Sequence, residues 1–235
     1  MSNRKIALIT GANRGIGLEI AKQLGQQGIT VLIGARDEAR GKDTAKLLAK
    51  DGIDAHEVLI DVTDEASVKK AADTITKDYG QLDILVNNAG ISRDQGLKPS
   101  ELTLEAMRET YDTNVFGAVS VTNAMLPLLR KSDAGRIVNV SSSMGSLTLA
   151  ADPASPAAML SLLAYNSSKA ALNSVTLEYA KELRGTPIKV NSADPGYVYG
   201  ERTAVDGAKA AVRLATLPQD GPSGTFQGEH GTVAW

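Results

Sequence analysis

Two residues that could transfer a proton, Tyr165 and Lys169, lie four positions apart in the segment LLAYNSSKAALNSVTLEYAKEL. Its apolar residues recur at helical intervals, and side chains four apart share one helix face, with Cβ atoms roughly 5–6 Å apart. An ammonium beside a phenol favours the phenolate and lowers the tyrosine pKa from about 10, so the tyrosine can act as a general acid or base near neutral pH. The spacing alone leaves a packed tyrosine and a solvated lysine as the simpler interpretation.

A glycine-rich turn in RKIALITGANRGIGLEIAKQLGQQG predicts a dinucleotide site. The apolar run 6–9 is typical of a buried parallel strand, and Gly15 and Gly17 lead from the turn at Gly11 into an amphipathic helix. The spacing is G-x-x-x-G-x-G rather than G-x-G-x-x-G, but the physics is the same: glycines let the backbone approach a pyrophosphate, and the helix N-terminus attracts its charge. A plain connection is the alternative. The chain lacks a GKS or GKT after the turn, which argues against a mononucleotide P-loop.

The end of the second apolar run indicates which dinucleotide binds. Sites for NAD usually place a carboxylate there, whereas this chain has Ala35 and Arg36, with Arg14 inside the glycine turn. Two guanidinium groups suit the 2′-phosphate of NADP(H), because arginine makes permanently charged, bidentate contacts with phosphate. Asp37 leaves an alternative open, since it could pair with Arg36 or accept the ribose hydroxyls itself.

Seven short motifs then occur in a fixed order. They are TGANRGIG at 10–17, DVT at 61–63, NNAG at 87–90, Asn114 within TNVFG, the Ser141–Ser143 run after RIVNV, YNSSK at 165–169, and PGYV at 195–198. With these motifs the chain resembles the classical short-chain dehydrogenase/reductase family over essentially its whole length, as a carbonyl-reductase-like member.

The resemblance implies catalytic roles for four residues. Tyr165 would be the general acid in carbonyl reduction, and Lys169 would lower its pKa and bind the nicotinamide ribose. Ser142 would hydrogen-bond the substrate oxygen as charge builds on it, with Ser143 as the second choice. Asn114 would hold a water molecule that relays protons to the lysine; a surface or helix-capping asparagine is the alternative.

The resemblance also implies the cofactor contacts. Asp61 and Val62 would contact adenine, the segment 88–90 the adenosine ribose, and the segment 195–198 the nicotinamide carboxamide. The full set is Gly11, Asn13, Arg14, Gly15, Ile16, Gly17, Arg36, Asp61, Val62, Asn88, Ala89, Gly90, Tyr165, Lys169, Pro195, Gly196 and Val198.

The pattern of elements predicts the fold. Strand-like runs at 6–9, 30–34, 56–60, 82–86, 136–140 and 188–192 alternate with helical patterns near 15–27, 38–50, 64–79, 101–131, 157–184 and 203–216. Such alternation predicts an α/β fold, a Rossmann-type doubly wound parallel sheet with helices on both faces. With 235 residues, 43% of them hydrophobic, a single NADP(H)-binding domain over 1–235 is expected.

Composition excludes several classes of protein. The absence of cysteine excludes disulfides and thiol catalysis, and two distant histidines, His56 and His230, both expected at the surface, argue against a metal site. A net charge of −2 gives no electrostatic basis for nucleic-acid binding. No signal peptide or long apolar span is recognised, so the expected location is the cytoplasm, without a membrane.

Two departures from the family pattern concern the substrate. The segment before Tyr165 carries an insertion at about 144–163, whose apolar residues either line a substrate pocket or cap the core. The loop at about 199–203 is short, and Gly200 stands where the family has threonine or serine. The resemblance implies a dimer or tetramer formed through 101–131 and 157–184, or a monomer if the insertion blocks that face.

The predicted function is NADPH-dependent reduction of ketones or aldehydes to alcohols, reversible, on a small-molecule substrate. Two alternatives remain at this stage. One is a non-catalytic NADP(H)-sensing protein that keeps the nucleotide site, although Ser142, Tyr165 and Lys169 are all intact. The other is a relative of another reaction class, an epimerase or dehydratase.

Overall fold

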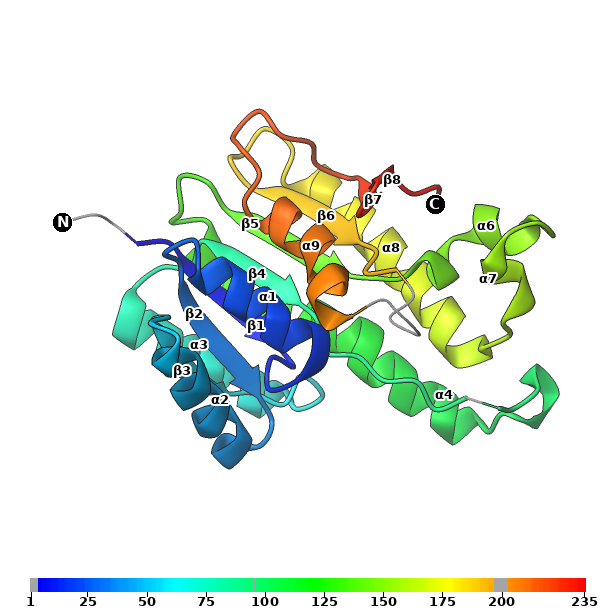
Figure 1. Cartoon of the computed structure of the whole chain (residues 1–235), viewed down its shortest axis with the longest axis horizontal. Coiled ribbons are helices and arrows are strands. Elements are labelled where there is room, and N and C mark those ends of the chain that lie inside the picture. Colours follow the sequence, from blue (N-terminus) through cyan, green and yellow to red (C-terminus); the bar gives the residue numbers. More distant parts are fainter. Residues whose placement is uncertain (1–3, 95, 197–202) are drawn as a thin grey trace.

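The computed structural model describes residues 4–94, 96–196 and 203–235, and its centre is one eight-stranded sheet in the order β3-β2-β1-β4-β5-β6-β7-β8 (Figure 1). The strands are β1 (Ile6–Thr10), β2 (Thr30–Ala35), β3 (Ala55–Leu59), β4 (Ile84–Asn87), β5 (Arg136–Val140), β6 (Lys189–Ala193), β7 (Phe226–Gly228) and β8 (Gly231–Thr232). All neighbours are parallel except β7 and β8. The chain order reverses between β1 and β4, and such a switch point is where doubly wound sheets bind ligands.

Helices cover both faces of the sheet (Figure 1). They are α1 (Gly15–Gly25), α2 (Glu38–Lys50), α3 (Glu65–Tyr79), α4 (Leu104–Tyr111), α5 (Gly117–Leu129), α6 (Leu147–Ala151), α7 (Pro156–Met159), α8 (Leu163–Glu182) and α9 (Ala204–Ala215). The predicted α/β fold, a doubly wound Rossmann-type sheet, is confirmed.

Strand alternation explains the two layers. In β1, Ala7 and Ile9 join a buried cluster with α1, α2 and α9, whereas Ile6 and Leu8 join a second cluster with α3 and α5. Successive side chains of a strand point to opposite faces, so a strand covered on both sides must be apolar throughout. The uninterrupted run Ile6–Ile9 meets that requirement.

The helical pattern at 101–131 corresponds to continuous helix from Leu104 to Leu129, in which a π-helical turn at Asp112–Phe116 separates α4 from α5. The second long helical prediction began too early. The pattern at 157–184 contains the short helix α7, which begins with Pro156, and α8 starts only at Leu163. Single π-helical turns inside an α-helix are frequent at functional sites. The π-helical turn at Asp112–Phe116 contains Asn114.

The C-terminal hairpin β7–β8 and the helix α6 were not predicted. Phe226 is fully buried and its ring stacks on Trp235, with ring centroids 5.5 Å apart. The carbonyl of Trp235 accepts a hydrogen bond of 3.0 Å from the backbone amide of Thr148 in α6. The end of the chain is thus attached to the insertion.

Both histidines lie where they were expected, since the His56 side chain is half exposed and that of His230 almost fully exposed. Within the described ranges, no three His, Cys, Asp or Glu side chains gather in a way that could hold a metal ion. The helices of those ranges include none that is both long and apolar enough to cross a membrane.

Candidate functional site

A cleft of about 390 Å³ opens at the carboxyl ends of the strands around the switch point. The predicted cofactor residues that line it are Gly11, Asn13, Arg14, Gly15, Ile16, Gly17, Arg36, Asp61, Val62, Asn88, Ala89 and Gly90. Four residues that were not predicted also line it, Ile60, Thr63, Ile91 and Thr113. Ile60 and Ile91 directly adjoin DVT and NNAG, and Thr63 and Thr113 belong to DVT and TNVFG.

The glycine turn has the backbone of an anion cradle. Gly11 and Gly15 have positive φ angles of +65° and +58°, which side chains with a Cβ rarely adopt. Arg14, at the N-cap position of α1, gives the first turn no side-chain hydrogen bond in the described part of the chain. The first-turn residues Gly15 to Gly17 line the cleft, so their amides and the helix dipole are available to a pyrophosphate. These residues fit a dinucleotide.

The absence of a side chain at Gly17 lets Asn88 and the Gly11 carbonyl pack closely against the start of α1. A Cβ at this position would lie 2.4 Å from Asn88 Nδ2 and 2.7 Å from the Gly11 carbonyl. We expect Gly17→Ala to lower NADPH affinity at least about tenfold, because a backbone that must shift can no longer follow the pyrophosphate. Titration of NADPH fluorescence measures this change, and an unaltered affinity would contradict the packing argument. Gly28→Ala changes a glycine outside the cleft and controls for stability, since its added Cβ meets no atom within 4 Å although its φ of +81° adds strain.

The loop after β4 is fastened to the glycine turn by Thr10. Its hydroxyl oxygen accepts hydrogen bonds from the amides of Asn88 and Ala89, both at 3.0 Å. The Asn88 side chain donates to the Thr10 carbonyl at 2.8 Å. Asn88 lines the cleft as predicted, and Thr10, which the sequence analysis did not assign to the site, joins the end of β1 to the loop after β4.

Arg14 and Arg36 both line the cleft, and Asp37 does not compete for them. The Asp37 carboxylate caps α2, accepting from the Arg40 amide at 3.1 Å, and forms an ion pair with the Arg40 guanidinium at 3.3 Å. In the structure, the partner of the Asp37 carboxylate is thus Arg40. Arg14 and Arg36 thus line the same cleft, as the predicted site for a 2′-phosphate requires.

Tyr165 and Lys169 lie on the first two turns of α8, and the Lys169 Nζ is 5.6 Å from the centre of the Tyr165 ring. Lys169 is buried and donates a hydrogen bond of 2.8 Å to the Val140 carbonyl. Burial lowers the pKa of Lys169 to about 8, because the charged ammonium loses water. The pair is thus the helical arrangement that the spacing predicted, rather than a solvated lysine.

Asn114 is buried, so neither a surface position nor an exposed cap describes it. Its side chain accepts from the Ile91 amide at 2.8 Å and donates to the Ile91 carbonyl and the Ser168 hydroxyl, both at 2.9 Å. These bonds engage the side-chain amide with protein. The water relay that the family resemblance implies at Asn114 stays a prediction.

The three serines after β5 differ in their surroundings. Ser141 is buried, and its hydroxyl donates to the Lys169 carbonyl at 3.4 Å. Ser142 is partly exposed and its hydroxyl oxygen caps the following 3₁₀ turn, accepting from the Met144 amide at 3.2 Å. The Ser143 amide is bound by Asp194 at 2.9 Å. Ser141 is therefore the buried one of the three, whereas Ser142 and Ser143 are both partly exposed.

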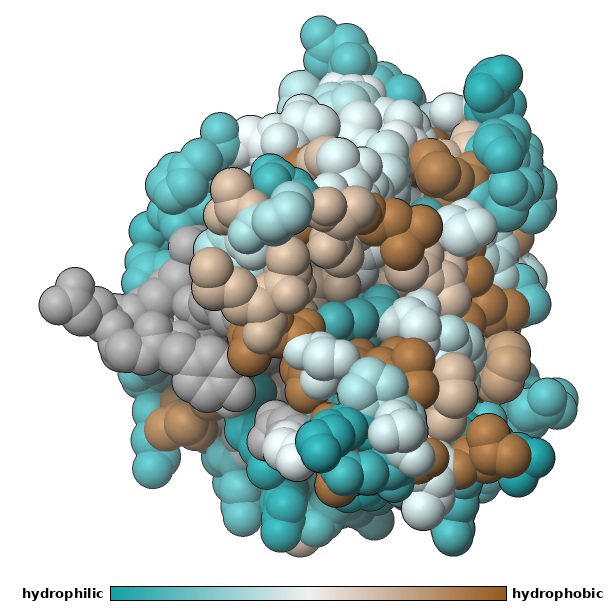
Figure 2. Space-filling model, turned by 90° about the vertical axis from the view of Figure 1, so that its right-hand side faces the viewer, coloured by the Kyte–Doolittle hydropathy of each residue, from teal (hydrophilic) through white to brown (hydrophobic). Residues whose placement is uncertain are grey.

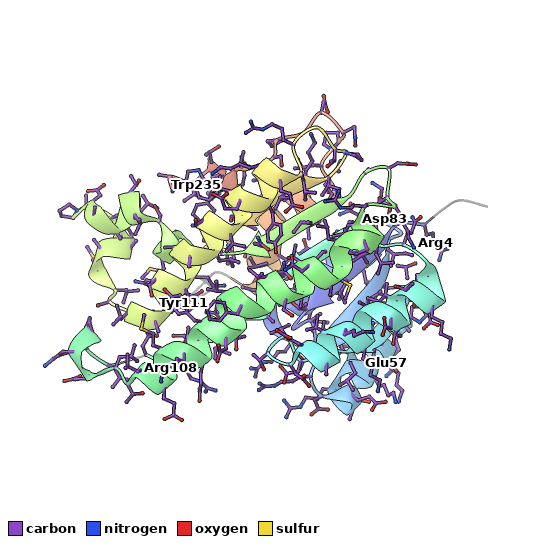
Figure 3. The ribbon with its side chains drawn as sticks, turned by 180° about the vertical axis from the view of Figure 1, so that it is seen from behind. Arg4, Glu57, Asp83, Arg108, Tyr111 and Trp235 are labelled. Carbon is purple, nitrogen blue, oxygen red and sulfur yellow. The ribbon has the colours of Figure 1, made fainter. Side chains whose placement is uncertain are left out.

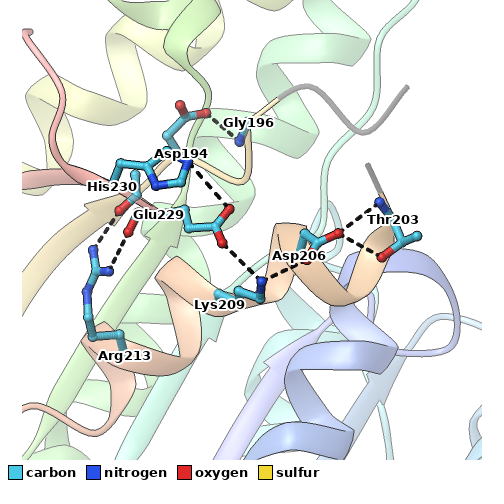
Figure 4. Close-up of polar contacts among 9 residues, drawn as sticks. Asp194, Gly196, Thr203, Asp206, Lys209, Arg213, Glu229 and His230 are labelled. Carbon is cyan, nitrogen blue, oxygen red and sulfur yellow. Dashed lines mark hydrogen bonds and ion pairs between the residues drawn. The ribbon is translucent and has the colours of Figure 1, made fainter. Parts of the chain in front are cut away.

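The segment after β6 is held by Asp194, Pro195 being buried beside it. One oxygen of Asp194 accepts from both the Ser143 and Gly196 amides, joining the serine loop to the segment predicted to meet the nicotinamide. Nearby, Lys209 of α9 pairs with Asp206 and Glu229, which connects α9 to the C-terminal hairpin (Figure 4). The structure describes the chain up to Gly196 and again from Thr203. Val198, Gly200 and the predicted short loop at about 199–203, except for its last residue, therefore lie outside the described residues.

The insertion forms α6 and α7 at one end of the molecule. Met159, Leu160 and Leu163 are exposed, at 75%, 48% and 40%, so they do not cap the core. Figure 2 shows this end, with hydrophobic side chains distributed among hydrophilic ones. Of the two alternatives for the insertion, core capping is wrong for these three side chains.

Comparison with known proteins agrees with this geometry. A family model described as short chain dehydrogenase matches residues 5–210. Short-chain dehydrogenase/reductase 1 of Saponaria officinalis is 35% identical, with 96% of this chain and 94% of that protein covered. Salutaridine reductase of Papaver bracteatum is 34% identical with the same coverage. The solved structure of NADPH-bound carbonyl reductase from chicken fatty liver superposes with a TM-score of 0.84 at 29% identity, covering 99% of both chains. The cleft at the switch point and the tyrosine–lysine pair on α8 thus lie on a chain that belongs to the short-chain dehydrogenase family.

Proposed function

We propose that the protein is an oxidoreductase that reduces ketones or aldehydes to alcohols with NADPH, and catalyses the reverse oxidation. The observation that carries this proposal is the buried Lys169 ammonium, 5.6 Å from the Tyr165 ring, on the same helix. The names of two similar proteins, salutaridine reductase and carbonyl reductase, support a carbonyl substrate. Turnover of NADPH with a carbonyl compound tests it.

Each residue has a defined task in this proposal. Arg14 and Arg36 bind the 2′-phosphate and the first-turn amides of α1 bind the pyrophosphate. When bound, NADPH supplies the hydride that the carbonyl carbon receives. Tyr165 donates its phenolic proton to the carbonyl oxygen, and the Ser142 hydroxyl donates a hydrogen bond to that oxygen as negative charge develops. Lys169 stabilises the phenolate that remains.

The pH dependence of reduction follows from Lys169. Its pKa is lowered to about 8, so the ammonium is largely present at pH 7 and is lost as the pH rises through about 8. We expect kcat/KM for reduction to fall above about pH 8, whereas Lys169→Met should be slow and lack this decline. Rates across the pH range, with the unfolding midpoint recorded at each pH, measure the effect. A wild-type profile that stays level to about pH 9.5 would exclude Lys169 as the titrating group.

The predicted extent, assembly and location belong to the same proposal. The chain 1–235 is proposed as one NADP(H)-binding domain, with the insertion at about 144–163 and the short loop at about 199–203 beside the substrate. Assembly as a dimer or tetramer through α5 and α8, or as a monomer, is decided by light scattering. A cytoplasmic location is decided by cell fractionation.

A further inference from the structure

The first turn of α8 is capped by a residue from another part of the chain. Leu162, at the N-cap position, offers no side-chain hydrogen bond. Instead, Asp94 Oδ2 accepts from the amide of Ala164 at 2.7 Å and from the amide of Tyr165 at 3.2 Å, across 70 and 71 residues of sequence. These are the second and third residues of the helix, the amides that a local Ser, Thr or Asp normally caps.

Asp94 is buried, with 1% of its surface exposed. Its second oxygen accepts a hydrogen bond of 2.9 Å from the Ser92 hydroxyl, so both carboxylate oxygens have partners. A buried carboxylate is costly unless it is fully hydrogen-bonded, and the positive end of a helix dipole favours it further. An exposed cap residue next to the helix in sequence would have satisfied the same amides without burying a charge. Because the cap is Asp94 instead, the start of α8 is bound to the loop that carries Asp94.

That loop also forms one wall of the cofactor cleft. Asp94 follows the NNAG segment after β4, whose residues Asn88 to Gly90 and the next residue, Ile91, line the cleft. Moving this loop relative to α8 would therefore move the cofactor wall relative to the tyrosine.

The carbonyl of Tyr165 is attached to the same loop by a second route. It accepts a hydrogen bond of 2.7 Å from the Ser168 hydroxyl, which in turn accepts from Asn114 Nδ2. Asn114 is bound to both backbone groups of Ile91. The Tyr165 amide is thus held through Asp94 and its carbonyl through Ser168 and Asn114.

We propose that Asp94 is a positioning residue that fixes Tyr165 at the correct distance from the cofactor wall. The inference rests on the proposed function, in which Tyr165 is the proton donor. Asp94 itself touches neither substrate nor cofactor in this account. A misplacement of about 1 Å at a reacting group can cost about 100-fold in rate, which sets the size of the effect.

The test compares Asp94→Ala with Asp94→Asn. The alanine variant loses every bond of the carboxylate, whereas the asparagine oxygen can still accept from both amides of α8. We expect Asp94→Ala to lower kcat about 30- to 100-fold, with the Kd for NADPH changed less than about threefold, and Asp94→Asn to recover kcat to within about fivefold of wild type. All assays are run well below the lowest unfolding midpoint.

Asp83→Ala is the matched control. Asp83 is another buried aspartate, 6% exposed, that binds the Ile6 amide at 2.9 Å and the Ser132 hydroxyl at 2.5 Å. It precedes β4, whereas the site follows that strand, and it lies beside Arg4 at the end of the molecule away from Tyr111 (Figure 3). This variant should lose stability and keep kcat within about twofold. Equal losses of kcat in the two alanine variants, or NADPH affinity falling in parallel with kcat, would overturn the proposal.

Two further measurements keep the test decisive. If Asp94→Ala does not fold, Ser92→Ala replaces it, because this change removes the hydrogen bond that orients the Asp94 carboxylate. Ser92→Ala should lower kcat about three- to tenfold without weakening NADPH binding, and an unchanged kcat would overturn the proposal.

Amide hydrogen exchange at Ala164 and Tyr165 should accelerate in Asp94→Ala and not in Asp83→Ala. Amide exchange is measured without turnover. If the wild-type protein has no reductase activity, the proposed function is refuted, and the exchange rates of Ala164 and Tyr165 still test whether Asp94 caps α8.

Discussion

Tyr165→Phe should lower kcat for carbonyl reduction by about 1000-fold or more and leave NADPH binding within about threefold of wild type. The substitution removes only the phenolic oxygen, so the ring stays beside Lys169 and the backbone bonds to Asp94 and Ser168 persist. Loss of the proton donor affects the chemical step and not the cofactor cleft. Single-turnover kinetics together with NADPH fluorescence separate the two quantities.

Tyr179→Phe provides the matched control for this variant. Tyr179 lies on the same helix, and its hydroxyl donates a hydrogen bond of 2.7 Å to Asn123 Oδ1, on the side of the helix that packs against α5. Removing this hydroxyl should cost about 1 kcal/mol of stability and leave kcat unchanged. If both phenylalanine variants lose activity equally, or if Tyr165→Phe retains more than about a tenth of wild-type kcat, Tyr165 is not the proton donor.

The second large effect concerns cofactor choice. Replacing Arg14 and Arg36 together with alanine should raise the KM for NADPH about 100- to 1000-fold and leave the KM for NADH within about threefold. A charge-assisted hydrogen bond contributes about 1.5–3 kcal/mol, and NADH lacks the phosphate that would accept it. Each single variant should raise the KM for NADPH at least about tenfold.

Arg130→Ala controls for the loss of positive charge. Arg130 follows α5 and pairs with Glu182 on the surface at 3.1 Å, and it does not line the cleft. This variant should leave both KM values unchanged. A double variant at Arg14 and Arg36 that loses NADPH and NADH equally would show that these arginines shape the cleft without reading the 2′-phosphate.

The sequence was sufficient to predict features that depend on local patterns. The apolar run at Ile6–Ile9 and the glycines at 11, 15 and 17 require a buried strand and a tight turn wherever they occur. The i,i+4 spacing likewise brings Lys169 beside Tyr165 because a helix has a fixed geometry. Cofactor residues in the glycine, DVT and NNAG motifs meet in one cleft because parallel strands end at the same edge.

Features that depend on long-range partners could not be predicted. The role of Asp94 is visible only once its loop lies against α8, since no local pattern links residues 70 positions apart. The sequence left two partners open for Asp37, and the structure selects a third, Arg40, one helical turn away. Strand β7 is three residues long, too short to show a strand period in the sequence, and its Phe226 is fully buried.

Transfer of deuterium from NADPH that carries deuterium at both C4 positions of the nicotinamide tests the central claim most directly. Purified protein is incubated with the labelled cofactor and a panel of aldehydes, aryl ketones and α-keto esters, and the alcohols are analysed by mass spectrometry. The account predicts an alcohol that carries deuterium on its carbinol carbon with wild-type protein, formed at least about 1000-fold more slowly with Tyr165→Phe. Tight NADPH binding without labelled alcohol from any compound would contradict it and would favour an NADP(H)-sensing role.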